Sequence, residues 1–347
     1  MRHRYRFLVF ALLLAAPLAH AQPALTTPDV SPHARVTQTV GITEITIDYH
    51  RPGVNGRAIW GALVPYDMVW RAGANENTTF EVSTDVAVEG QPLPAGRYGL
   101  HMIPTTGAWT VIFSTMADAW GSFSYDEAED ALRVTVTPRP ADFQERLLYR
   151  FDDPTGTSTE VVLHWENVEV PFTVTVETPE VVLANMEREL RGLPRFFWQG
   201  WNQAAAYALQ SETRMEDALG WVDRSIAMNR NGTNLGTKMG LLTALGRADE
   251  AAALEAEFYE VATEADVNAY GYLLLGTGRT DDAIAVFRRN VADHPESWNV
   301  HDSLGEALAA AGQTAEAITH YEHARSMAPA VQHARIDGIL AQLRGTN

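Results

Sequence analysis

The chain has 347 residues, a formal net charge of -18 and no cysteine. Disulfides, thiol nucleophiles and thiolate metal sites are therefore excluded. So strong a negative charge also opposes binding to nucleic acid or to anionic lipid headgroups. The length predicts about two domains, and the charge favours partners that are neutral or cationic.

The first residues have the pattern of a cleavable targeting signal. Arginines alternate within residues 2–6, and the apolar stretch at 7–18 is too short to span a membrane. Ala19-His20-Ala21 then offers small residues to a signal peptidase. We expect residues 1–21 to be removed by a cut after Ala21, a linker at 22–30, and a periplasmic or secreted protein. An uncleaved membrane anchor is the alternative, and the lack of a cysteine after the cut argues against a lipid anchor.

Residues 31–178 have the two-residue period of β-strands. Apolar positions alternate in about nine or ten short segments, and Gly, Pro, Asp and Asn separate these segments. Gly41 lies where the first two segments turn. This spacing predicts an all-β antiparallel sandwich or jelly-roll-like domain, with a weak helical interruption at 126–130.

Residues 179–347 have the period of helices instead. A set of glycine, alanine, aromatic and proline positions recurs after 34 residues, which is the tetratricopeptide period. The set is Gly271, Gly278, Ala283, Phe287 and Pro295, repeated as Gly305, Gly312, Ala317, Tyr321 and Pro329. The first glycine lets two helices approach, the second ends a helix in a left-handed cap, and the proline stops the next helix.

The rest of this half fits the same architecture. Weaker copies of the repeat lie upstream, so we expect three to four helical hairpins from about Leu193 onward. A bridging helix is expected at 179–190, and a helix at 334–343 is expected to cap the stack. This all-α, tetratricopeptide-like solenoid would present a concave groove.

The β half carries its motifs in the order of a known family. The segments "SPHARVTQTVG", "ITIDYHRPGVNGRAIWGALVPYDMVWRAGANENTTF", "LPAGRYGLHMIP" and "WTVIFS" precede "WGSFSYDEAEDALRVTV" and "VPFTV". Residues 31–175 thereby resemble the bacterial domain-of-unknown-function family 2911, whose members are often exported and sometimes fused to tetratricopeptide repeats. The resemblance implies a fold and export but no reaction, because the family has none established. His101 departs from the aromatic or small residue that we expect at its position.

The stretch "VWRAGANENTTF" is the best candidate for a site in the β half. Arg71, Asn75 and Glu76 lie on a turn before a strand, where Arg71 can pair with Glu76 and Asn75 can adopt a left-handed backbone. In the favoured interpretation they are a structural latch, and in the alternative they line a pocket for a small polar ligand. Arg51 and Arg57 would add positive charge to that pocket.

Other candidate groups in the β half are weaker. His33, His50, His101 and His164 lack the spacing of a local metal motif, so no metal site is expected, although His101 remains a ligand-binding candidate. Four aromatic residues can form a platform for sugars, but core packing is the favoured interpretation. They are Trp109, Trp120, Phe123 and Tyr125. The acids at 126–130 are typical of a solvated face.

The groove of the helical half has its own candidates. Helical spacing places Asn268, Tyr272, Asn299, Asp302 and Glu306 on the first helices of the two clear repeats. These side chains offer acceptors and no cation, so a neutral or basic peptide fits better than an acidic one. The alternative is that they are only solvated.

The sequence therefore favours an exported interaction or scaffolding protein. No Gly-x-Ser-x-Gly, His-Glu-x-x-His or phosphate-binding glycine loop is present, so no catalytic residue and no cofactor are expected and a non-enzymatic function is favoured. The partner would be a protein or peptide bound by the helical repeats. The alternative function is a small-ligand or carbohydrate-binding β-sandwich, with or without activity on the carbohydrate.

Overall fold

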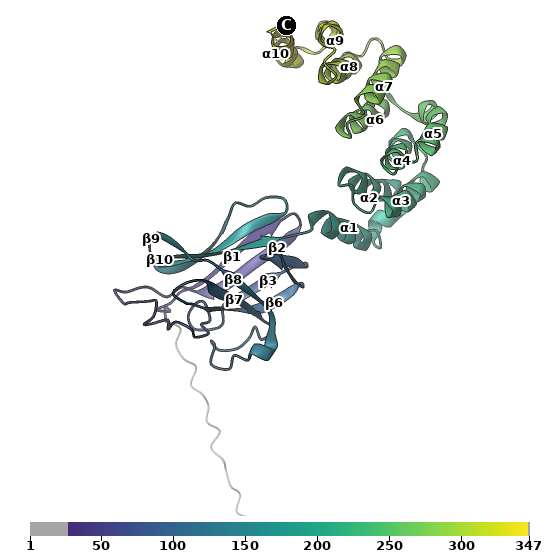
Figure 1. The fold of residues 1–347 in the computed structure, drawn as a ribbon. Coiled ribbons are helices and arrows are strands. Elements are labelled where there is room, and N and C mark those ends of the chain that lie inside the picture. The colour runs from purple at the N-terminus through teal and green to yellow at the C-terminus, as the bar shows by residue number, and fades with distance from the viewer. Residues whose placement is uncertain (1–26, 346–347) are drawn as a thin grey trace, which may run out of the picture.

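The computed structural model describes residues 27–345. The β part comes first and the helical part second, as the change of sequence period predicts (Figure 1). The expected signal peptide, its cut after Ala21 and most of the expected linker lie outside the described residues. Within the described part, no helix has the length and apolar character needed to cross a membrane.

The β part consists of two antiparallel sheets that share a core, which confirms the predicted antiparallel architecture. One sheet has the strand order β1-β2-β3-β6-β7-β8 and the other β5-β4-β10-β9. The strands are β1 (His33–Val40), β2 (Thr43–His50), β3 (Thr79–Val82), β4 (Val86–Val88), β5 (Gln91–Leu93), β6 (Gly96–Ile103), β7 (Trp109–Ser114), β8 (Asp130–Val136), β9 (Arg139–Asp152) and β10 (Ser158–Thr175). The weak helical interruption is the 3₁₀ turn η1 (Glu127–Glu129).

Strand alternation explains which face of each sheet is buried. Ile45, Ile47 and Tyr49 on β2 all belong to the shared core, since every second side chain of a strand points to the same face. The rings of Phe80 and Phe113 meet there edge to face, with centroids 5.0 Å apart. Core packing of this kind holds the sheets together and leaves their outer faces and loops to carry any site.

The β9–β10 hairpin differs from the short strands that the sequence predicts. β9 has 14 residues and β10 has 18. β10 runs through "STEVVLHWE" and into "VEVPFTVTVE", which alternation alone predicts as two separate strands. The pairing shifts register between His164 and Val168, and Glu166 there has φ of 55°. Such bulges let one strand change direction without ending, so the polar residues between its two halves do not mark a turn.

The helical part forms an arc of helical hairpins, and α2, α4, α6 and α8 follow its inner side (Figure 1). The helices are α1 (Thr178–Glu189), α2 (Trp198–Gln210), α3 (Met215–Met228), α4 (Gly232–Ala244), α5 (Ala248–Val261), α6 (Glu264–Gly276), α7 (Thr280–Asp293), α8 (Trp298–Ala310), α9 (Thr314–Met327) and α10 (Ala330–Gly345), with the 3₁₀ turn η2 (Leu193–Phe196) between α1 and α2. The predicted tetratricopeptide-like hairpins and the final capping helix are confirmed.

The repeated glycines have the roles that the sequence predicts. A Cβ atom at Gly271 would lie 2.5 Å from the ring of Phe287, and one at Gly305 would lie 3.0 Å from the ring of Tyr321. Gly278 and Gly312 have φ of 77° and 73°, the left-handed conformation of a helix cap. The close approach of paired helices therefore depends on the missing side chains.

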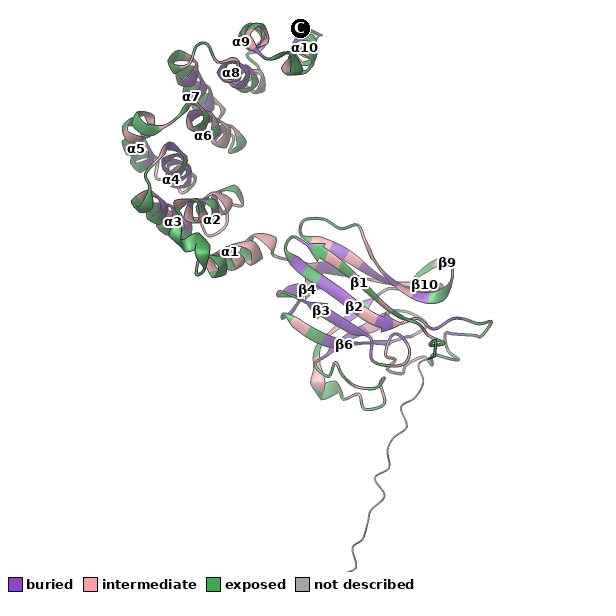
Figure 2. Cartoon of the chain, turned by 180° about the vertical axis from the view of Figure 1, so that it is seen from behind, coloured by how far each residue is buried: buried purple, intermediate pink, exposed green. Residues whose placement is uncertain are grey.

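The expected bridging helix is α1, which contacts both parts of the chain. Val181 packs against the β core, whereas Leu183 is buried in the core of the first helical hairpin. The hydroxyl of Thr178 donates to the carbonyl of Gly156 at 2.7 Å. Val181 is only partly buried, whereas Leu183 is fully buried, so α1 is fixed mainly in the helical part and reaches the β part at one end (Figure 2).

Candidate functional site

A cavity of about 270 Å³ opens at one end of the β-sandwich, and it contains part of the predicted pocket. Arg57 and Arg71 both line it, together with the indole rings of Trp70 and Trp165, which stack at 18° with centroids 6.0 Å apart. Arginine side chains beside flat apolar walls suit a small ligand that carries negative charge or many hydroxyl groups.

Arg71 is the most exceptional residue of this cavity. It forms no hydrogen bond or ion pair with any other described residue, and Phe123 is its aromatic neighbour, with the ring centroid 5.9 Å from Cζ. Burial lowers the pKa of Arg71, and the nearby charge of Glu76 opposes this change. Gly121 lies so close that a Cβ atom there would overlap the Arg71 guanidinium. A half-buried cation without a partner is available to an anionic ligand.

The neighbouring candidates shape the loop around this cavity. Arg51 donates to the carbonyl of Leu147 at 2.9 Å, and Arg57 donates to the carbonyl of Val54 at 3.1 Å. These arginines therefore satisfy backbone acceptors, as in the latch interpretation.

The other two candidates of the "VWRAGANENTTF" turn, Asn75 and Glu76, form no hydrogen bond or ion pair with Arg71. Asn75 has the left-handed backbone that we expect, with φ of 57°. Glu76 contacts His50, at 3.4 Å between Oε2 and Nε2, and forms no ion pair with Arg71. The expected pairing within the turn is thus replaced by a contact to β2, which leaves Arg71 unpaired.

His101 lies outside the cavity, on the outer face of the six-stranded sheet. It is 2% exposed, and its Nδ1 lies 2.8 Å from Oγ of Ser122. Burial lowers the pKa of His101 to about 4, while the charge of Asp130 opposes the shift, so the imidazole is neutral near pH 7. The loop that holds Ser122 also holds Gly121 over Arg71, so one loop covers both candidates.

The four aromatic candidates do not form one platform. Trp109 is in the core, as the favoured interpretation predicts. The hydroxyl of Tyr125 donates to Asp130 at 2.6 Å. Trp120 and Phe123 instead are 60% and 86% exposed, so the core interpretation is wrong for these two residues.

Two of the histidines of the β half lie together and the others lie apart. His33 contacts Asp48 at 2.7 Å, and its ring meets that of His50 edge to face with centroids 5.3 Å apart. His164 lies in a network on the β9–β10 hairpin. Among residues 27–345, no three His, Asp or Glu side chains are arranged so that they could hold a metal ion.

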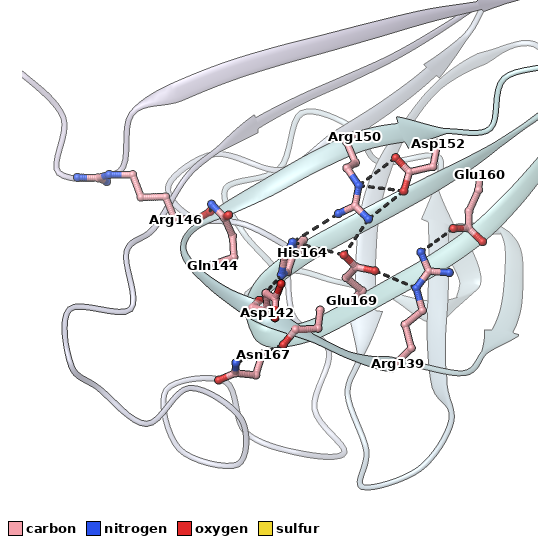
Figure 3. Close-up of polar contacts among 11 residues, drawn as sticks. Arg139, Asp142, Gln144, Arg146, Arg150, Asp152, Glu160, His164, Asn167 and Glu169 are labelled. Atoms are coloured by element: carbon pink, nitrogen blue, oxygen red, sulfur yellow. Dashed lines mark hydrogen bonds and ion pairs between the residues drawn. The ribbon is translucent and has the colours of Figure 1, made fainter.

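The network around His164 is shown in Figure 3 and was not predicted. The Glu169 carboxylate accepts hydrogen bonds from Arg150 at 2.7 Å and from Arg139 at 2.8 Å. Arg139 also donates to the Glu160 carboxylate at 2.8 Å. The two arginines hold the pKa of Glu169 below its usual value, although burial opposes this. These partners are up to 30 residues apart in sequence, and every arginine in the network is paired. We interpret it as a structural lock on the bulged hairpin.

The predicted groove residues lie on α6 and α8 but are mostly committed to internal contacts. The hydroxyl of Tyr272 donates to Glu306 at 2.8 Å. Arg335 on α10 donates to the Asp302 carboxylate at 2.8 Å. Asn268 has a buried Oδ1 without a hydrogen-bond partner among the described residues, and Asn299 is half-buried near the start of α8.

A cavity of about 460 Å³ opens on the inner side of the arc, between α2 and α6. Tyr272 is the predicted groove residue that lines it, and Leu209 and Leu273 form apolar walls. Both leucines also reach α4 at Gly240, where a Cβ atom would lie 2.8 Å from each. Glu212 is the charged residue of its lining, so the cavity is apolar with one acidic edge.

A histidine cluster between α8 and α9 was also missed. The ring of His301 stacks on His320 and on His323, with centroids 5.3 Å and 5.1 Å apart. Burial and the neighbouring His301 lower the pKa of His320. The spacing of His320 and His323, three apart on one helix, was the available sequence signal.

The fold defines a two-part protein, an antiparallel β-sandwich joined to a tetratricopeptide-like solenoid. Residues 31–174 match the family described as protein of unknown function (DUF2911), which agrees with the resemblance seen in the sequence. Residues 240–328 match the family described as bacterial transcriptional activator domain. No curated protein matches the chain.

Solved structures resemble the chain only in part. A thermophilic tetratricopeptide protein of Thermus thermophilus has 18% identity and a TM-score of 0.35, covering 48% of this chain and 90% of its own. MamA from Desulfovibrio magneticus RS-1 has 16% identity and a TM-score of 0.30, covering 43% and 84%. A human IFIT1 dimer with PPP-AAAA has 17% identity and a TM-score of 0.30, covering 48% of this chain and 41% of that one.

Proposed function

We propose that this protein is an exported interaction or scaffolding protein whose helical groove binds a neutral or basic peptide segment. The observation that carries the proposal is the cavity between α2 and α6, on the inner side of the arc. Stacked helical hairpins commonly use such concave surfaces for recognition.

The chemistry of the cavity supports a peptide with an apolar side chain. Leu209, Leu273 and the Tyr272 ring offer apolar walls, while Glu212 offers a carboxylate at the edge. An apolar side chain that fills the space gains about 25 cal/mol for each Å² of apolar surface that it buries. A lysine or arginine beside that side chain would pair with Glu212, and an acidic residue would be repelled.

The internal contacts of the groove change which residues we expect to matter. Asp302 and Glu306 already accept hydrogen bonds from Arg335 and Tyr272, so they are expected to position the wall rather than to bind directly. Asn268 lies one turn before Tyr272, but its unpartnered Oδ1 is buried and it does not line the cavity. We therefore place the centre of recognition at Tyr272 and Glu212.

A peptide-display selection on the mature protein tests the groove. We expect wild-type protein to enrich peptides in which Lys or Arg accompanies Leu, Phe or Met. Glu212→Lys combined with Tyr272→Ala is expected to lose this enrichment, whereas Glu260→Lys is the matched control on the outer helix α5. Equal enrichment by the wild type and the double variant would refute the groove as the binding surface.

Export rests on the N-terminal pattern alone. We expect the mature protein to begin at Gln22 and to be found in the periplasmic or secreted fraction. N-terminal sequencing of the protein from each cell fraction measures both features. An intact Met1 in a cytoplasmic fraction would contradict this part of the proposal.

The second candidate function is binding of a small anionic or carbohydrate ligand at the β-sandwich. The specific observation in its favour is the unpaired Arg71 beside Trp70 and Trp165 in one cavity. Thermal-shift screening of the mature protein against sugars and small anions tests it. A stabilising ligand whose effect is lost in Arg71→Gln but kept in Arg97→Gln supports it, and no shift with any ligand counts against it.

A further inference from the structure

The turn between α1 and α2 exposes more large apolar side chains than any other short described segment. Leu193 and Phe196 are each 72% exposed, and Phe197 is 54% exposed. This region is drawn as exposed in Figure 2. Scattered exposed apolar residues are ordinary, whereas three within five positions concentrate apolar surface in one turn, as interaction sites do.

A cavity of about 350 Å³ lies beside this turn, between α1, α2 and α3. Its apolar walls are Leu190, Trp201 and Trp221. The indole Nε1 of Trp201 donates to the carbonyl of Arg195 at 3.0 Å, which fixes the orientation of the ring. The guanidinium carbon of Arg224 lies 4.6 Å from the centroid of that ring. The guanidinium carbon of Arg214 lies 5.4 Å from the centroid of the Trp221 ring, so the cavity is a preformed aromatic pocket with a cation over each tryptophan.

Arginines surround this pocket, and they have no carboxylate partner among the described residues. Arg191, Arg195 and Arg224 line it, and none forms an ion pair with any of those residues. Glu187 also lines the pocket, but its carboxylate is taken by Arg214 at 2.9 Å. We refer to Arg191, Arg195, Arg224, Trp201 and Trp221 as the arginine–tryptophan pocket.

The rest of the solenoid shows how unusual these free arginines are. Acidic residues outnumber lysine and arginine by 44 to 26 in the whole chain. Every described arginine after Arg224 has a carboxylate within ion-pair distance. They are Arg230, Arg247, Arg279, Arg288, Arg289, Arg325, Arg335 and Arg344. In so acidic a chain, a cluster of arginines without carboxylates is available to the acidic groups of a partner.

We propose that the arginine–tryptophan pocket binds a protein segment in which acidic residues flank a large apolar side chain. The apolar side chain would enter between Trp201 and Trp221, and the acidic residues would pair with the three arginines at the rim. A peptide fits better than an anionic membrane because the pocket is shaped for a side chain and the net charge of -18 opposes a charged bilayer. This surface has the opposite charge preference to the groove, so the protein would hold two different segments at once.

Selection of random peptides on the full mature protein tests this proposal. We expect peptides with Asp or Glu beside Leu, Phe or Trp to be enriched. The variant Arg191→Glu/Arg195→Glu/Arg224→Glu is expected to lose them and to keep the basic peptides of the groove. Arg230→Glu/Arg288→Glu/Arg289→Glu makes the same change of charge elsewhere and is expected to keep both classes.

The affinity of one synthetic enriched peptide, measured by fluorescence anisotropy, makes the test quantitative. At least a tenfold weakening by the pocket variant supports the proposal, and so does a similar weakening by Trp201→Ser if circular dichroism shows an intact fold. Unchanged affinity in both variants overturns it. It is also overturned if phosphatidylglycerol vesicles, or a second copy of the chain in sedimentation, compete for the pocket while no acidic peptide binds. If wild-type protein enriches the acidic class but not the basic class, the groove proposal fails and this pocket remains supported.

Discussion

Replacing Gly271 with alanine tests the packing that gives the solenoid its shape. The new Cβ atom would lie 2.5, 2.7 and 2.9 Å from atoms of the Phe287 ring, which is fully buried and has little room to move. Alanine gains about 0.8–1 kcal/mol over glycine inside a helix, whereas overpacking of a core costs about 1–3 kcal/mol. We therefore expect Gly271→Ala to lower the free energy of unfolding by about 0–2 kcal/mol.

Two matched variants separate packing from helix propensity. A Cβ atom added at Gly338 on α10 would have no neighbouring atom within 4 Å, so Gly338→Ala should be stabilising by about 0.8–1 kcal/mol. At Gly305 the nearest Tyr321 atom would be 3.0 Å away, so Gly305→Ala should fall between the other two. Urea unfolding followed by the circular dichroism of the helices measures all three. If Gly271→Ala stabilises as much as Gly338→Ala, the close-packing argument is refuted.

Three further predictions concern charged and titrating groups. Glu169→Gln removes the carboxylate that holds two arginines and should lower the free energy of unfolding by about 1–3 kcal/mol. Asp118→Asn, in an exposed ion pair, should change the free energy of unfolding by less than about 0.5 kcal/mol. Equal effects of the two substitutions would contradict the structural role proposed for the network on the hairpin. The pKa of His101 is lowered to about 4 by burial, so the stability that its neutral form contributes is present above the unfolded value near 6.5 and is lost as pH falls toward 4. A urea midpoint that falls no further in wild type than in His101→Asn between about pH 7 and about pH 5 would argue against this. The lowered pKa of His320 has the same sign, so His320→Gln should reduce acid loss of structure in the last hairpin, read by hydrogen exchange on α9.

Local patterns in the sequence were enough to predict most of the fold. Gly278 and Gly312 indicated helix caps because few residues other than glycine adopt a positive φ easily, and both angles are positive. Alternation of apolar and polar residues predicted the strands, because successive side chains of a strand point to opposite faces of the sheet. The long strand β10 was divided in two because a bulge places polar residues where a turn would also place them.

The candidate sites were harder to predict because their contacts join distant segments. Glu76 is close to Arg71 in the chain but contacts His50, which lies on β2. Asp302 has the pattern of a free acceptor in the groove, yet Arg335 on a later helix lies against it. The ion-pair partners of long charged side chains depend on how the helices and sheets pack, and the periodicity of the sequence does not predict them.

Site-specific photocrosslinking in intact cells tests the central claim most directly. A photoreactive amino acid at Ala269 would lie in the cavity between α2 and α6, and one at Ala253 would lie on the outer helix α5, where it is also exposed. We expect a discrete protein adduct from position 269 that disappears with Glu212→Lys, and no adduct from position 253. Adducts of equal yield from both positions, or an adduct from 253 alone, would contradict recognition by the groove.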